Sequence, residues 1–239
     1  MKHPDFMIRL LASLVLCAVA IGDAFAQGSN TLTDLEKKQG WQLLFDGSST
    51  KGWHTYNKKT IGAEWHVTDG TLWLDPVPGS RDIVTDREFG DFELLLEWMI
   101  DSCGNSGVFF NVVESSTYEF GWHTGPEMQI LHNACHPDGK IPKHRAGNLY
   151  DLIASETESV KGPRQWNQVR ILNEKGHLEF WLNGVKQVET TMFTPQWFVM
   201  IKASKFVEFP DFGKARKGKI MLQEHGSRVW FRNIKIREL

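Results

Sequence analysis

The chain has 239 residues, of which 41% are hydrophobic and 12% aromatic, and its formal net charge at pH 7 is −2. A chain this close to neutrality, without basic runs, is not expected to bind nucleic acid or an anionic membrane surface.

The first 26 residues have the pattern of a secretion signal. A weakly basic start precedes an apolar run from Leu10 to Ile21, and Ala24-Phe25-Ala26 supplies small residues at positions −3 and −1 of a cleavage site. The run is shorter than the roughly 20 residues of a membrane-spanning helix, so no membrane span is expected. A lipid anchor at Cys17 is disfavoured because Leu16 stands where a small residue is normal. We therefore expect export, to the periplasm or the medium.

Residues 27–239 are predicted to form a single domain, since all-β units of roughly 200–250 residues are common. The segment 27–40 is polar and predicts a short helix around Thr33–Lys38. Short apolar or alternating runs then recur between turn signals, and they predict strands. These runs are Trp41–Phe45, Trp65–Val67, Thr71–Leu74, Phe92–Ile100, Gly107–Val113, Glu127–Leu131, Asn167–Leu172, His177–Leu182, Val185–Thr190, Ile220–Glu224 and Val229–Arg237. Many short strands without alternating helices indicate a two-sheet jelly-roll β-sandwich.

Two details refine this pattern. Asn183-Gly184 is the strongest hairpin signal, because both central turn positions need positive φ. The run Phe92–Ile100 also suits a helix, but its neighbourhood favours a strand. Glu93 and Glu97 would then share one face, and the other face would be core.

The stretches Asn133–Arg164 and Ala203–Lys219 are too long for hairpin loops and are expected to border a site.

Two cysteines remain after the signal, Cys103 and Cys135. Their spacing matches no metal motif, and an oxidising compartment would allow them to pair. We expect two free thiols, because a domain of this size does not need a covalent link.

The ten tryptophans suggest a sugar ligand, because indole rings stack on the apolar faces of pyranose rings. Most of them alternate with other strand residues and are expected in the core. Trp122 is the exception, since the surrounding residues 118–123 resemble a loop. It is our candidate for contact with a sugar.

A row of polar residues follows on the strand Glu127–Leu131. Glu127 and Gln129 point to one side of such a strand, and a bulge after Ile130 would bring His132 to the same side. Retaining sandwich glucanases place acidic residues at this spacing, one as nucleophile and one as acid/base. Gln129 and His132 replace two of those acids, so a two-carboxylate mechanism does not follow. A solvent-exposed polar face is the alternative to a site.

Two further segments are candidates. Asn105 lies in the turn Gly104–Gly107, whose small residues allow a ligand or backbone to approach closely. His225 ends the predicted strand Ile220–Glu224, where an imidazole suits acid/base work near neutral pH. Each segment is equally well explained as an ordinary turn.

Several motifs together resemble the 3-keto-disaccharide hydrolase family. In chain order they are Leu43-Leu44-Phe45-Asp46-Gly47, Gly52-Trp53, Asp69-Gly70-Thr71-Leu72, Phe92-Glu93, Glu97-Trp98, Gly104–Phe110, Glu127–Leu131, Gly147, Tyr150-Asp151, Trp166-Asn167, Asn183-Gly184, Ser204-Lys205-Phe206, Leu222–Gly226 and Phe231-Arg232-Asn233-Ile234. They span nearly the whole chain after the signal, which makes the set far more specific than any single motif.

The resemblance implies a concanavalin A-like sandwich that cleaves glycosides carrying a ketone at C3. A 3-ketone acidifies the C2–H, so a base can remove that proton while the C1 substituent leaves, and water then adds to the product. Glu127 or His225 would be the base. Lys205, Asn105 and Gln129 would hold or polarise sugar oxygens, and Trp122 and Tyr150 would also contact the substrate.

The resemblance also implies that Glu97 and His132 would complete a metal site or protonate the leaving group. A divalent cation is one way to polarise the ketone, and no other cofactor is implied. The partner is then a small carbohydrate. The alternatives are a non-catalytic carbohydrate-binding sandwich, a retaining endo-glucanase and a purely structural surface protein.

Overall fold

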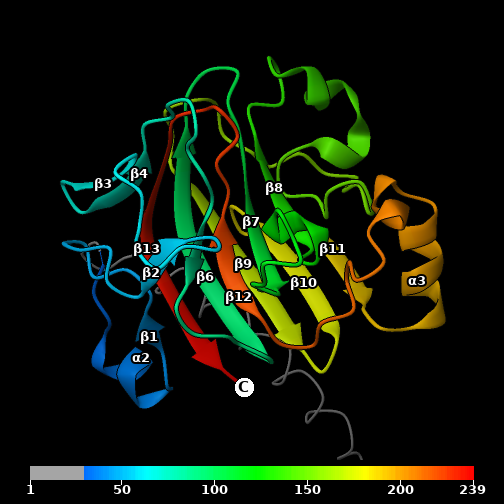
Figure 1. The fold of residues 1–239 in the computed structure, drawn as a ribbon, viewed down its shortest axis with the longest axis horizontal. Helices are drawn as coiled ribbons and strands as arrows, with labels where there is room; N and C mark the ends of the chain where they lie inside the picture. Colours follow the sequence, from blue (N-terminus) through cyan, green and yellow to red (C-terminus); the bar gives the residue numbers. More distant parts are fainter. Residues whose placement is uncertain (1–29) are drawn as a thin grey trace, which may run out of the picture.

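The computed structural model describes residues 30–239, and the expected signal peptide at residues 1–26 lies outside this range, as does Cys17. The described chain forms two antiparallel sheets that lie one over the other (Figure 1). The two-sheet sandwich expected from the strand pattern is therefore confirmed. No helix within residues 30–239 is long and apolar enough to cross a membrane.

The larger sheet has eight strands in the order β11-β10-β9-β6-β13-β4-β3, with β1 also paired to β13. Its strands are β1 (Gln42–Leu43), β3 (Trp65–Thr68), β4 (Thr71–Leu74), β6 (Phe92–Ile100), β9 (Asn167–Glu174), β10 (His177–Leu182), β11 (Val185–Thr191) and β13 (Val229–Glu238). Asn183 and Gly184 join β10 to β11 with φ of 51° and 80°, as the hairpin signal predicts.

The smaller sheet has five strands in the order β2-β5-β12-β7-β8. They are β2 (Trp53–Thr55), β5 (Ile83–Thr85), β7 (Asn105–Val112), β8 (Glu127–Leu131) and β12 (Lys219–Leu222). The sequence analysis does not predict β2 or β5, because a strand of three residues is too short to show an alternating pattern.

Helices are few and short. They are α2 (Asp34–Lys38), α3 (Pro195–Lys202) and the 3₁₀ turns η1 (Gly121–His123), η2 (Pro137–Lys140), η3 (Pro142–His144) and η4 (Lys205–Glu208). The expected N-terminal helix is α2, which begins with a capping box between Thr33 and Glu36. Helix α3 is missing from the predicted elements. Its start signal is Thr194, whose side chain accepts from the Trp197 N–H, followed by Pro195 at the first helical position.

The main core fills the space between the sheets. Leu94, Leu96 and Trp98 of β6 point into it, while Glu93 and Glu97 lie on the other face, as the alternation predicts. A second, small cluster lies on the outer face of the five-stranded sheet. It consists of Tyr56, Val84, Phe109, Val112 and Met221, with Trp122 packed against it. This cluster supports the loops that surround the candidate site.

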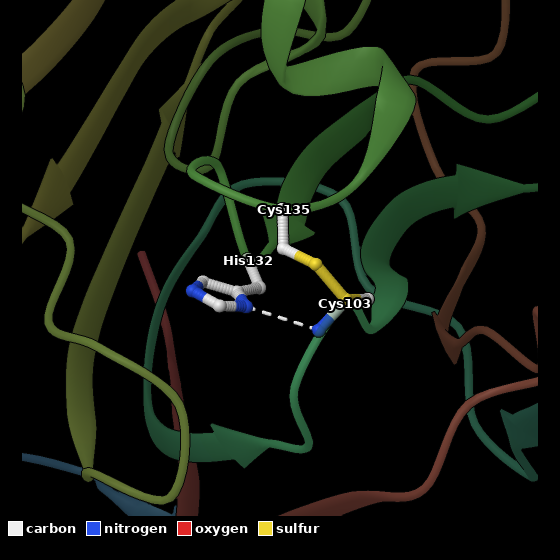
Figure 2. A group of neighbouring side chains, drawn as sticks. All are labelled: Cys103, His132 and Cys135. Carbon is white, nitrogen blue, oxygen red and sulfur yellow. Dashed lines mark hydrogen bonds between the residues drawn. A yellow bond between two sulfur atoms is a disulfide. The ribbon is translucent and has the colours of Figure 1, made fainter.

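Cys103 and Cys135 form a disulfide, so the expectation of two free thiols is wrong (Figure 2). The pairing of β7 with β8 sets Asn105 opposite Leu131. The turn before β7 and the turn after β8 therefore meet at one end of the sheet, and the two Cα atoms lie 4.8 Å apart. Domain size is no guide here, because sheet pairing, and not a need for extra stability, brings the thiols together.

Candidate active site

A pocket of about 180 Å³ opens on the outer face of the five-stranded sheet. Its lining residues come from β7, β8, the segment that follows β12 and three loops. They are Asn105, Trp122, Glu127, Gln129, Tyr150, Lys205, Phe206, Gln223 and His225. Seven of the nine residues proposed from the sequence thus lie in one pocket. Both long stretches expected to border a site contribute, the first through Tyr150 and the second through Lys205 and Phe206.

Glu127 lies at the start of β8, and its side chain crosses Gly107 of the neighbouring strand. The register sets Gly107 opposite Gln129 and Phe109 opposite Glu127. A methyl group at position 107 would overlap the carboxyl group of Glu127. Gly107 is therefore needed here for close approach, and its small size lets the acid lie flat on the sheet.

Burial dominates the electrostatics of Glu127. It raises the pKa of this carboxyl group to about 8; the ammonium group of Lys205 opposes the rise, and the nearby carboxyl groups of Asp82 and Asp138 add to it. A buried acid with such a pKa carries its proton at neutral pH and is a strong base once ionised. A group of this kind is suited to proton transfer.

Three amide side chains surround the acid. The oxygen of Gln129 accepts from the Ile130 N–H, which leaves its NH₂ group to face the pocket. The side-chain oxygens of Asn105 and Gln223 are buried and have no hydrogen-bond partner among the described residues. Buried polar atoms are normally paired, so these two oxygens point to a polar ligand.

Tyr150 and Lys205 are held by a network behind the pocket wall. The Tyr150 ring stacks on His144, with ring centroids 4.3 Å apart, and its hydroxyl group donates to Asp138. The backbone N–H of Lys205 donates to Asp151, whose other carboxylate oxygen bonds His144 at 3.0 Å. The Lys205 ammonium nitrogen lies 4.2 Å from the centre of the Tyr150 ring. Since ring and ammonium group share these supports, the two pocket residues are positioned as a unit.

His225 and Gln223 lie on the segment that follows β12. Gln223 continues the sheet, because its N–H donates to Gly107 O and its carbonyl group accepts from the Ser106 hydroxyl group. Asp82 holds the next residue by accepting from the Glu224 N–H at 2.8 Å. Burial, followed by the charge of Glu224, raises the pKa of Asp82 to about 7. His225 itself is exposed at the mouth of the pocket.

The structure does not bring Glu97 into the pocket. Glu97 belongs to the larger sheet, where its oxygens accept from Arg232 and Asn233 at 2.8 and 3.0 Å. Glu93 and Glu97 share the polar face of β6, as predicted, but that face is turned away from the five-stranded sheet. The expectation of a substrate-binding role for Glu97 is not supported by its position.

His132 is also outside the pocket. The expected bulge after Ile130 is absent, since β7 and β8 pair without a register shift and β8 ends at Leu131. His132 lies beyond the strand, next to the disulfide, and its Nδ1 accepts from the Cys103 N–H at 2.9 Å (Figure 2). It therefore orders the turn at the end of the sheet.

Sequence reasoning missed two lining residues, Phe206 and Gln223. Both belong to the motifs that carry the family resemblance, so that signal was available. The supporting residues Asp82, Asp138 and His144 had no sequence signal, because each acts through a neighbour that lies far from it along the chain or in an irregular loop. Asp151, the fourth supporting residue, belongs to the Tyr150-Asp151 motif.

The pocket contains groups that can ligate a divalent cation, namely a carboxyl group, two unpaired amide oxygens and an imidazole. Within residues 30–239, two groups of three His, Cys, Asp or Glu side chains lie close enough to share an ion, and neither is in this pocket. One is Cys103, His132 and Cys135, where the disulfide occupies both sulfurs (Figure 2). The other is His177, Glu179 and Glu189.

Comparison with known proteins identifies the class. A protein from Parabacteroides distasonis, assigned as a glycosyl hydrolase, superimposes with a TM-score of 0.84 at 33% identity, over 89% of this chain and all of that chain. A carbohydrate-binding module from Bacillus subtilis, at 12% identity and a TM-score of 0.51, shares the fold over 78% of this chain and 96% of its own. Fold and pocket together define a carbohydrate-active β-sandwich protein.

The family is more specific. Residues 40–237 match the model of the 3-keto-alpha-glucoside-1,2-lyase-like domain. A 3-keto-disaccharide hydrolase from Bacteroides thetaiotaomicron is 30% identical over 228 residues, which cover 84% of this chain and 79% of the relative. The chain belongs to this family, as its motifs indicate, and it is an enzyme that acts on glycosidic bonds.

Proposed function

We propose that the protein cleaves 3-keto-glycosides, 3-keto-disaccharides among them, by elimination followed by hydration. The observation that carries the proposal is the composition of the pocket. Glu127 is the only acid among its nine lining residues, and it lies among amides, an ammonium group and an imidazole. Ordinary glycoside hydrolysis uses two carboxyl groups that flank the bond. A 3-keto-sugar needs one base, one acid and groups that polarise the ketone.

The reaction balances as follows. The base removes the C2 proton, the C1–O bond breaks, and the leaving oxygen takes up a proton. The product of this step has a C1=C2 double bond conjugated with the ketone. Water then adds its hydroxyl group to C1 and a proton to C2, so the net change is hydrolysis.

We assign the C2 base to Glu127. Its raised pKa makes its carboxylate form a stronger base than an exposed glutamate, and it is buried among the polar residues that line the pocket. His225, at the mouth, donates the proton to the leaving oxygen. Lys205 and the amides of Asn105, Gln129 and Gln223 stabilise the negative charge that develops on the ketone oxygen and bind hydroxyl groups. A divalent cation held by the unpaired amide oxygens of Asn105 and Gln223 would supply further polarisation of that oxygen.

We also propose that the protein is exported. The signal pattern at residues 1–26 supports this, and the Cys103–Cys135 disulfide adds support because disulfides persist in oxidising compartments.

The proposal is tested with purified protein and a 3-keto-disaccharide, in EDTA and with added Mn²⁺, Co²⁺ or Ca²⁺. Release of the free sugar is expected from the wild type, and Glu127→Gln should reduce its rate by about 10²–10⁴-fold, as loss of an acid/base group does. Ser155→Ala, a change outside the lining of the pocket, is the control. No release under any condition would refute the proposal, and tight binding of unoxidised glycans would then favour a binding protein.

A further inference from the structure

A second, larger cavity of about 470 Å³ adjoins the pocket. The two share three lining residues, Trp122, Gln223 and His225. The shared residues form a common wall, so one ligand can extend from the first space into the second. Each volume by itself suits a small ligand, and together they fall in the usual range for binding sites.

The outer cavity has an aromatic wall. Phe120 and Trp122 are stacked, with ring centroids 5.5 Å apart and planes inclined by 16°. Phe209 packs edge-on against Trp122 at 4.9 Å and fixes its ring. Both stacked rings are half-buried and line the cavity, so they offer an apolar surface of the kind that receives the C–H face of a pyranose.

The polar residues of the outer cavity carry both signs of charge. Arg81 contributes a cation, whereas Glu119, Asp82 and Glu224 contribute carboxyl groups. Donors and acceptors are thus both present, and cations are not in excess. This composition suits a neutral polyol and disfavours a phosphate, a sulfate or a uronic acid.

We propose that the outer cavity binds the leaving sugar, a neutral pyranose, while the inner pocket binds the 3-keto ring. This inference rests on the proposed function and extends it to a second binding site. The glycosidic bond then crosses the shared wall, which places the His225 imidazole beside the leaving oxygen and Trp122 beside both rings.

The test compares two substrates that differ only in the leaving group, a 3-keto-disaccharide with a hexose leaving group and 3-keto methyl glucoside. Phe120→Leu removes an aromatic face, and Arg81→Ala removes an exposed donor; both residues line only the outer cavity. Each should lower kcat/KM for the disaccharide by about five- to tenfold and leave the methyl glucoside unchanged. Phe193→Leu and Arg216→Ala, a stacked pair that lines neither cavity, are the matched controls.

Equal losses on both substrates, or no loss on the disaccharide, would overturn the outer site while leaving the proposed function in place. A wild-type protein that acts on neither substrate would overturn the proposed function and the outer site with it. Arg81 is exposed, so its variant tests the proposal even where Phe120→Leu disturbs packing.

Discussion

The side chain of Glu127 lies across Gly107, and the pocket depends on this contact between two neighbouring strands. Gly107→Ala should keep the sandwich but displace the carboxyl group. A displacement of about 1 Å can cost roughly 10²-fold in rate, so we expect a loss of this order in kcat/KM for a 3-keto-disaccharide. Gly162→Ala, where a methyl group meets only an ordinary contact at 3.6 Å, is the control. Full activity in a folded Gly107→Ala protein would contradict the role of this contact.

The pH dependence of the reaction should identify the role of Glu127. The experiment uses His225→Asn, which removes the imidazole, and a 3-keto-glucoside whose aryl leaving group needs no protonation. Under these conditions Glu127 is the main titrating group of the pocket. As a base it must be ionised, so residual kcat/KM should rise as the pH passes its pKa of about 8. The measurement is a pH–rate profile corrected for the spontaneous reaction. A rate that falls through this range would make Glu127 the proton donor.

The burial of Glu127 should also affect how the free energy of unfolding depends on pH. Its pKa is about 8 in the folded protein and near 4.5 when exposed, so the folded state retains a proton that the unfolded state loses between these values. Stability therefore falls as the pH rises from about 5 to 8. Glu127→Gln removes this titration and should be more stable than the wild type above pH 8, by roughly 2–4 kcal/mol, with little difference near pH 5. Urea unfolding at both pH values measures this, and a pH-independent difference would contradict the assignment.

The disulfide should contribute substantially to stability. It joins residues 32 positions apart, for which loop-closure entropy gives about 3–4 kcal/mol. The double variant Cys103→Ser/Cys135→Ser should lose about this much free energy of unfolding. Thiol alkylation followed by mass determination shows whether the bridge is present in the wild type. Two reactive thiols in a protein prepared without reductant would contradict the pairing.

Glu97 should affect stability and not turnover. Its carboxylate is nearly buried and pairs with Arg232, so Glu97→Gln should cost about 1–3 kcal/mol by weakening this pair. The kcat/KM for a 3-keto-disaccharide should stay unchanged. Thermal unfolding and a rate assay on the same preparation separate the two effects. Lost turnover in a variant of unchanged stability would show that Glu97 takes part in the site.

The alternating strands could be predicted from the sequence, as could the Asn183-Gly184 hairpin and the two faces of β6, because a period of two and turn chemistry are local properties. Seven pocket residues could also be proposed from the sequence. Trp122 was proposed from its loop-like surroundings, and the other six lie in the motifs that resemble the family.

Which polar strand face belongs to the site depends on the packing of the two sheets and could not be predicted from the sequence. Glu97 and Glu127 have similar local patterns, but one strand lies in each sheet, and only the outer face of the five-stranded sheet is covered by the loops of Tyr150 and Lys205. The Cys103–Cys135 bridge, the crossing of Glu127 over Gly107 and the raised pKa of Glu127 depend likewise on strand pairing and burial. These join residues that are distant in the chain, and no local pattern encodes them.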